Sequence, residues 1–266
     1  MTSRVDAVIS YLILIFFSIV SVGPILGIII QAFTGPQLGR DWTIDNVVRV
    51  WHAGLFQGAM LNSLIVAIGV TALGVTLSVL AGYAFGCLRF RGSTPVFYLI
   101  LLGLIVPLEP VLISLYFNFL GLKLTDTYVG LIVAQAMFYF PFGVFWMRAF
   151  FRSIPRSLLE AARIDGASDF RVLFAVLLPA AGPAIMTLSV LMFVWSWNEF
   201  FLPLVIWGGR AVPTATVVTG LFTGQRLADI PGAAAAAVIL SVPVLVVYVV
   251  FQRQFIRGVL AGSVKG

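Results

Sequence analysis

The chain of 266 residues has little charge, one histidine and one cysteine, and each shortage excludes a class of protein. Only 10% of its residues are charged and 61% are hydrophobic, which excludes a soluble globular domain. The single cysteine, Cys87, excludes an intrachain disulfide, and we interpret it as a small buried apolar residue. The single histidine, His52, lies in a predicted surface loop. With only one histidine and one cysteine, the chain cannot form the common metal-ligand clusters or the common nucleophile–base pairs.

Lysine is also scarce, and this excludes the usual ATP-binding loop. A Walker A loop needs Gly-Lys followed by Ser or Thr. The only lysines, Lys123 and Lys265, follow Leu122 and Val264. The chain therefore cannot contain this loop, and any ATP hydrolysis that drives it must come from another polypeptide.

Long apolar stretches dominate what is present. Six of them reach the ~20 residues that a helix needs to cross a bilayer. They lie near residues 7–32, 58–84, 95–118, 129–150, 182–206 and 232–253. The first is too long for a signal-peptide core and has no small-x-small cleavage site before Thr34, so we expect it to remain as an anchor. The predicted fold class is an all-α integral membrane protein with a single transmembrane domain over 1–266.

The basic residues predict the orientation of these spans. Eleven of the sixteen Lys and Arg residues fall in one set of connecting segments and five in the opposite set. The richer side should be cytoplasmic, which puts both termini inside. The richer set is Arg4, Arg89, Arg91, Arg148, Arg152, Arg156, Arg163, Arg171, Arg253, Arg257 and Lys265, and the poorer set is Arg40, Arg49, Lys123, Arg210 and Arg226.

Two longer segments are predicted on the external side. Residues 43–51 read as a short surface helix with an apolar stripe at the membrane interface. The segment from Trp207 to Ile230 is rich in Gly, Thr and Pro, and we expect a loop there.

The most informative polar stretch is the predicted cytoplasmic segment 153–179. Pro155 suits the first helical position, where its missing N–H costs nothing, and Gly166 suits a left-handed turn after the end of the helix. Ser168 can cap a second helix, which we expect to run to Leu178 and to end at Pro179. Taken alone, the short helix is equally consistent with an ordinary solvated loop helix rich in good helix formers.

Specific motifs favour a docking role for this segment. The segment contains a spaced motif that closely resembles the EAA signature of ABC importer permeases. The motif is Glu160-Ala161-Ala162, three residues, Gly166, nine residues, Val176, one residue and Leu178-Pro179. That family usually has isoleucine at the position of Val176. Further similarity to the carbohydrate-uptake branch lies in residues 61–64 (LNSL), 81–85 (AGYAF), 195–200 (WSWNEF) and 261–266 (AGSVKG). The chain resembles the second, G-type permease subunit of that branch over nearly its whole length.

The resemblance implies a type I ABC importer permease that works by alternating access with a second homologous permease. It implies two ATP-binding subunits that hold ATP and Mg, and an extracytoplasmic substrate-binding protein that the 207–230 segment reaches. It also implies that the tail after Arg253 touches the ATP-binding subunits, although a short basic tail equally suits a lipid anchor. No cofactor is expected in this chain. The residues expected to couple it to the ATPase are Glu160, Ala161, Ala162, Asp165, Gly166 and Pro179.

Polar residues inside the predicted spans suggest a second site. Glu109 and Glu199 lie ~15 Å and ~10 Å below the outer ends of their spans, at 1.5 Å per residue, and ionisable groups at such depth indicate function. Pro107 and Pro110 predict an interruption of the third span, although Ser114 stands where the resembled family often has proline. Spacing puts Trp195, Asn198 and Glu199 on one helical face, which suits a sugar ring and its hydroxyls. The predicted substrate pathway comprises Asn62, Glu109, Gln135, Tyr139, Trp195, Asn198 and Glu199.

Three other interpretations stay open at this point. The buried polar residues equally suit hydrogen bonds that hold helices together. A stand-alone secondary carrier would use Glu109 and Glu199 as proton or ion sites. A membrane assembly factor would transport nothing. The identity of the sugar or sugar-like solute is not encoded in any motif.

Overall fold

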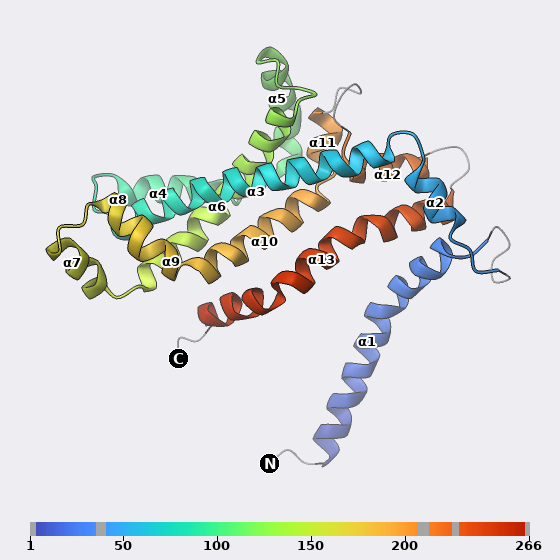
Figure 1. Cartoon of the computed structure of the whole chain (residues 1–266), viewed down its shortest axis with the longest axis horizontal. Helices are drawn as coiled ribbons and strands as arrows, with labels where there is room; N and C mark the ends of the chain where they lie inside the picture. The colour runs from blue at the N-terminus through green and yellow to red at the C-terminus, as the bar shows by residue number, and fades with distance from the viewer. Residues whose placement is uncertain (1–3, 36–40, 207–212, 225–228, 264–266) are drawn as a thin grey trace. The chain divides into compact units, whose positions relative to one another are not determined.

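The computed structural model describes the backbone over residues 4–35, 41–206, 213–224 and 229–263, with side chains described for residue 6 and from 8 to 220 and 229 to 252 within those ranges. Its described elements are helices, together with one isolated antiparallel bridge between Thr34 and Trp42. The chain divides into two compact units, one of residues 1–57 and 218–242 and the other of residues 58–217 and 243–266. An all-helical fold is therefore confirmed (Figure 1).

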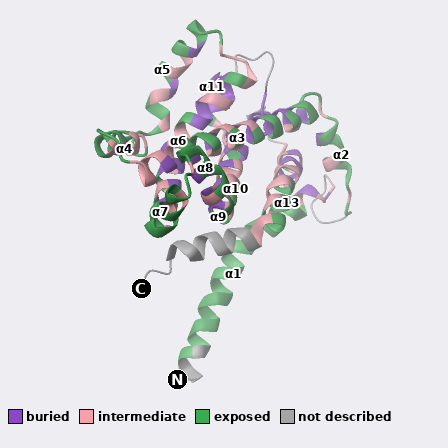
Figure 2. Cartoon of the chain, turned by 60° about the vertical axis from the view of Figure 1, so that its left-hand side comes forward, coloured by how far each residue is buried: buried purple, intermediate pink, exposed green. Residues whose placement is uncertain are grey.

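Four helices in the described part of the chain are long and apolar enough to cross a membrane. Their full ranges are α1 Arg4–Ala32, α3 Phe56–Cys87, α6 Tyr128–Ser153 and α13 Ile230–Ser263. They correspond to the first, second, fourth and sixth predicted spans. The described residues of α1 are exposed almost throughout, as Figure 2 shows in green, which suits a helix that faces lipid.

The third predicted span, 95–118, consists of two helices. Helix α4 (Ser93–Leu102) ends before Gly103, and α5 (Leu108–Gly121) begins after Pro107, whose extended backbone (φ −67°, ψ 142°) stands outside the helix. The predicted interruption at Pro107 is confirmed, because proline restricts the residue before it and favours a helix start after it. Each piece is too short to cross a bilayer alone.

The fifth predicted span, 182–206, is also divided. Helix α10 (Gly182–Asn198) ends at Glu199, and α11 (Phe201–Ile206) follows. The helical stretch before α10, Asp169–Ala180, meets it at an angle of 77°, so the two together could count as a fifth, bent span. Since Glu199 has an extended backbone (ψ 128°), it lies between helices and not within one.

On the predicted external side, one expectation is confirmed and one is wrong. Residues 45–51 form a helix, α2 (Asp45–Trp51), as expected. The segment from 207 to 230 is not simply a loop, because α12 (Ala215–Gly224) occupies part of it. Val217 and Val218 on α12 are 2% and 5% exposed, so burial of these side chains outweighs their low helix propensity. Residues 207–212 and 225–228 lie outside the described residues.

Close packing of α3 against α6 organises the larger unit. A Cβ on Gly82 of α3 would lie 2.9 Å from the backbone nitrogen of Arg148 on α6, and one on Gly86 would lie 3.0 Å from the Cβ of Phe151. Because these two glycines are one turn apart, they form a small-residue stripe that lets the backbones approach. The core beside this contact includes Met147, Leu188 and Met192, each fully buried.

Candidate functional site

The 153–179 segment forms a hook of short helices, which we call the coupling segment, at one end of α6 (Figure 1). Helix α7 (Arg156–Ile164) follows Pro155, which is the N-cap and not, as we expected, the first helical residue. Its end is a Schellman turn: Ala167 N–H donates to Ala162 O and Gly166 N–H to Arg163 O, both at 3.0 Å. The φ of +77° at Gly166 confirms the predicted left-handed turn.

The second half of the coupling segment is helical but irregular. Ser168 accepts a hydrogen bond from Arg171 N–H (3.4 Å), as predicted for a cap, and α8 (Asp169–Arg171) leads into a π-helix, η1 (Val172–Leu177). The prediction that Pro179 ends this helix is wrong, because α9 (Leu178–Ala180) continues through it. Pro179 stands in the first turn of α9, where a missing N–H is tolerated directly after the wider π-turn.

Side chains on one face of the coupling segment are anchored in the core of the larger unit. Val172, Leu173 and Leu177 of η1 are 0–3% exposed, and they pack in one cluster with Tyr83 of α3 and Phe151 of α6. Tyr83 donates a hydrogen bond from its hydroxyl to the main-chain oxygen of Asp169, 3.1 Å away. The segment is therefore packed firmly on α3 and α6 and is not a loosely attached loop.

The opposite face projects from the molecule. Glu160 and Ala161 are exposed on α7, whereas Ala162 is half-buried and packs against the core cluster. Asp165 and Pro179 are also exposed. Of the two adjacent alanines, only Ala161 is thus fully open to a partner.

Exposed apolar residues extend this open surface, and sequence reasoning did not identify them. Ile164 is 86% exposed, and Phe170 is 73% exposed and stacks on Phe174 with ring centroids 5.5 Å apart. A signal was present in the sequence: Phe170 and Phe174 are four residues apart, out of phase with the buried Leu173 and Leu177. Large exposed apolar side chains beside a charged helix are typical of a protein contact.

The predicted pathway residues gather in part around Glu199. Its Oε2 accepts a hydrogen bond from the Tyr139 hydroxyl at 3.4 Å, and its Oε1 accepts from the backbone N–H groups of Phe201 (3.1 Å) and Leu202 (3.3 Å). The carboxylate therefore caps the start of α11, where negative charge is favoured. The ring of Trp195 lies 5.5 Å from that of Tyr139, centroid to centroid.

Two further predicted residues are buried and hold helices together. Asn62 is 9% exposed; its amide donates to Pro213 O (2.9 Å) and accepts from the Tyr128 hydroxyl (2.6 Å). Gln135 is 1% exposed and accepts from the Ser196 hydroxyl, while its Nε2 finds no acceptor within the described part of the chain. Tyr128 and Ser196 were not among the predicted residues, although Ser196 lies inside the WSWNEF motif.

The remaining two predicted residues, Glu109 and Asn198, make none of the contacts described for the other five. Glu109 is exposed in the first turn of α5. Asn198 is exposed at the end of α10, and its amide donates to Val194 O of its own helix (2.8 Å). Sequence spacing put Asn198 and Glu199 on one helical face, but α10 ends between them, so they do not share one.

Comparison with known proteins agrees with this architecture. Residues 74–260 match the family described as "Binding-protein-dependent transport system inner membrane component". The chain is 32% identical to the diacetylchitobiose uptake system permease protein of Streptomyces coelicolor, covering 99% of this chain and 91% of that protein. It is 30% identical to the arabinooligosaccharides transport system permease protein of Halalkalibacterium halodurans, with both chains covered completely. It is 32% identical to the trehalose transport system permease protein of Mycobacterium tuberculosis, over 87% and 85% of the two chains.

Solved structures give the same fold at lower identity. A bacterial ABC transporter involved in the import of the acidic polysaccharide alginate has a chain that superposes with a TM-score of 0.80 at 24% identity, covering 96% of this chain and 99% of that one. A second structure, of a bacterial alginate ABC transporter in complex with an alginate pentasaccharide-bound periplasmic protein, gives 0.75 at 17% identity, over 95% and 96%. The chain belongs to the family of inner membrane components of binding-protein-dependent transport systems.

Proposed function

We propose that this protein is the transmembrane permease subunit of a binding-protein-dependent ABC importer for a sugar or sugar-like solute. It couples ATP hydrolysis in partner subunits to alternating access, and ATP and Mg belong to those partners. The observation that carries the proposal is the coupling segment, which is rooted in the membrane core by Val172, Leu173 and Leu177 and exposes Glu160 and Ala161 on its other face. A rigid projection of this kind transmits force between a soluble motor and a membrane gate.

The partner surface consists of Glu160, Ala161, Asp165 and Gly166, with Ile164 and Phe170 beside them. Ala161 lets a cleft of the ATPase approach the backbone, and Glu160 offers a charge to a basic group of the partner. Ile164 and Phe170 supply the apolar contact area that a stable interface needs. Ala162 shapes the segment by packing against the core, and Pro179, which is exposed, does so by its place in the first turn of α9 after the π-turn.

The complete transporter comprises this chain, a second homologous permease, two ATP-binding subunits and an extracytoplasmic substrate-binding protein. We place the protein in the cell membrane of a prokaryote with six spans, in which α4 with α5 and α10 with α11 each make one interrupted span. Both termini and the coupling segment lie in the cytoplasm, as the distribution of basic residues predicts. The relatives named above are uptake permeases for carbohydrates, which supports this class of solute.

The proposed translocation lining is the polar layer around Glu199, Tyr139 and Trp195. An aromatic ring next to a carboxylate and a hydroxyl matches a sugar, whose apolar ring faces stack while its hydroxyls need hydrogen-bond partners. Gln135 adds a buried amide whose Nε2 has no acceptor within the described residues, so it is available to a solute or to another arrangement of the helices. Asn62, Asn198 and Glu109 complete the proposed pathway.

A stand-alone ion-coupled carrier is the less supported alternative. It would need Glu109 and Glu199 as free ion sites, but Glu199 is occupied as the cap of α11 and Glu109 is exposed on α5. It would also leave the projecting face of the coupling segment without a function.

The decisive experiment enlarges the one alanine that is open on α7. In the assembled transporter, Ala161→Phe should abolish co-purification of the ATP-binding subunits, or reduce solute uptake at least tenfold, because a bulky ring blocks close approach to the backbone. Since Ala161 is exposed, the variant should fold normally. The matched control is Ala180→Phe, an exposed alanine on α9 away from that surface. Normal assembly and uptake with Ala161→Phe would refute the proposal.

A further inference from the structure

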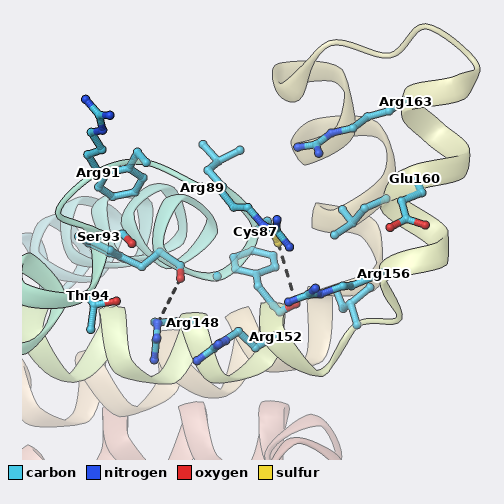
Figure 3. A pocket seen from close by; sticks show the side chains of 17 residues that line it. Cys87, Arg89, Arg91, Ser93, Thr94, Arg148, Arg152, Arg156, Glu160 and Arg163 are labelled. Carbon is cyan, nitrogen blue, oxygen red and sulfur yellow. Dashed lines mark hydrogen bonds between the residues drawn. The ribbon is translucent and has the colours of Figure 1, made fainter.

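A basic cavity of about 810 Å³ opens between the coupling segment and the ends of two membrane helices (Figure 3). Its walls come from the end of α3 and the turn after it, the start of α4, the last turns of α6, and α7. The charged groups that line it are Arg89, Arg91, Arg148, Arg152, Arg156, Arg163 and Glu160. Six guanidinium groups and one carboxylate give the lining a net charge of +5.

Two of these arginines already have partners. Arg148 donates from Nε to Phe85 O (3.2 Å) and lies 3.8 Å above the ring centre of Phe97. Arg163 pairs with Asp169 at 3.1 Å. These contacts hold Arg148, on the α6 side of the cavity, and Arg163, on the α7 side, in place.

The other four arginines, Arg89, Arg91, Arg152 and Arg156, are exposed and make no ion pair with any residue that the structure describes. Figure 3 shows Arg89 and Arg156 directed into the cavity from opposite walls. Like charges that line one cavity repel one another. An anion between them would relieve that repulsion and accept several charge-assisted hydrogen bonds.

Further donors favour a phosphate group over a carboxylate. Ser93 and Thr94 line the same cavity and stand in the first turn of α4, a helix of 10 residues. The backbone of that turn adds little, because Ser93 N–H already donates to Phe90 O (3.3 Å) and Pro95 has no N–H, so the two hydroxyls are the donors that this end of α4 offers. Hydroxyls and guanidinium groups together are typical surroundings of a bound phosphate.

The location points to the source of that phosphate. The candidate spans α3 and α6 end at Cys87 and Ser153, both next to the cavity, so it lies at the level where a membrane helix meets water. Val96 and Leu99 of α4 are 44% and 66% exposed and give an apolar surface close by for an acyl chain. We propose that this cavity binds the phosphodiester headgroup of an anionic phospholipid. The proposal rests on the cytoplasmic placement of the coupling segment given above.

Such a lipid would act at the coupling segment. The cavity joins the turn after α3 to α7, so a bound headgroup bridges Arg89 on one wall and Arg156 on the other. It would hold α7 against the membrane helices on the side away from Ala161. Basic cavities between membrane helices on the cytoplasmic side are known to select anionic headgroups.

The test measures lipid binding to the full chain in detergent by native mass spectrometry. Phosphatidylglycerol should bind at least tenfold more tightly than phosphatidylcholine of the same acyl composition. The double variant Arg89→Gln/Arg152→Gln should weaken binding of phosphatidylglycerol about thirtyfold, at roughly fivefold for each arginine lost at a membrane surface. The matched control Arg171→Gln removes an exposed arginine of α8 that does not line the cavity, and it should leave binding unchanged.

Three outcomes would overturn the proposal. Equal affinity of the wild-type chain for the two lipids excludes a headgroup site whether or not the variants fold. Inorganic phosphate that binds as tightly as the lipid makes this a site for a free anion. Unchanged lipid binding in the double variant excludes these arginines from a lipid site, and if the same variant fails to assemble with the ATP-binding subunits in the complete transporter, the cavity belongs to that partner. Because binding is measured without solute or ATP, its failure leaves the transport function untouched.

Discussion

The hydroxyl of Tyr83, about one turn before the end of the candidate membrane span α3, donates a hydrogen bond to the main-chain oxygen of Asp169 in the coupling segment, 3.1 Å away. The two residues are 86 positions apart in the sequence. The ring of Tyr83 also packs edge-on against Phe151 of α6 with centroids 6.0 Å apart. Three parts of the proposed relay, α3, α6 and α8, therefore meet at one tyrosine.

Removal of this hydrogen bond should weaken coupling more than it weakens folding. Tyr83→Phe keeps the ring and its contacts but loses one hydrogen bond, worth about 0.5–1.5 kcal/mol. In the reconstituted transporter we expect the solute transported per ATP hydrolysed to fall severalfold. Tyr98→Phe, on the exposed side of α4, is the control and should leave the ratio unchanged. An unaltered ratio in Tyr83→Phe would exclude this contact from the relay.

The contact between α3 and α6 should not tolerate a methyl group at Gly82. A Cβ there would lie 2.9 Å from Arg148 N, so Gly82→Ala must push the two backbones apart and should destabilise the protein by about 1–3 kcal/mol. Gly58→Ala changes the same helix where a Cβ meets nothing within 4 Å. This control should be neutral or slightly stabilising, because alanine favours the helix by about 1 kcal/mol. Melting temperatures in detergent give the comparison, and equal values would contradict the packing described.

The ion pair between Arg49 and Asp229 predicts a loss of stability at acid pH in the smaller unit. Arg49 Nη2 lies 3.1 Å from Asp229 Oδ1, and this hydrogen bond holds the pKa of Asp229 below its usual range. Because the folded pKa is lowered, the stabilisation is present above the unfolded pKa and disappears as the pH falls through the folded pKa. Both side chains are partly exposed, at 51% and 32%, so the effect is only about 0.2–1 kcal/mol.

Asp229→Asn tests the ion pair separately from the hydrogen bond by which Asp229 caps the start of α13. Asp229 Oδ1 also accepts from Gly232 N–H at 2.9 Å, and an asparagine oxygen can do the same. The variant should melt at a lower temperature than the wild type at pH 7, and the difference should shrink below pH 4. Asp41→Asn, an exposed carboxylate, is the control and should show no such trend. A constant difference at all pH values would show that charge is not involved.

Substitutions in the polar layer should reduce uptake without preventing assembly. Glu199→Gln retains an oxygen that can cap α11 but removes the charge that faces Tyr139, and we expect uptake to fall about tenfold or more. Asn198→Ala should also lower uptake. The control is Asn118→Ala, because Asn118 donates to Ser114 O of its own helix (2.8 Å) just as Asn198 donates to Val194 O. Normal uptake in either test variant would remove that residue from the pathway.

The breaks in the helices show what sequence signals could and could not predict. The interruption at Pro107 was predictable because proline acts on its immediate neighbours. The end of α10 at Glu199 has no such local signal: the carboxylate caps α11, and Thr216 from α12 donates to the Glu199 main-chain oxygen (2.8 Å). The path of the chain through Pro179 depends likewise on a π-helix whose buried face packs on α3 and α6.

By itself, the sequence determined the all-helical class, the long apolar helices, the Gly166 turn and the family, because apolar length, backbone conformation and motif spacing act locally along the chain. Only the tertiary structure decided which face of the coupling segment is free, that Ala162 is packed while Ala161 is open, and that Glu199 joins Tyr139 while Glu109 does not. It also brought arginines from three segments around one cavity. These features depend on packing between residues far apart in sequence, which no local pattern records.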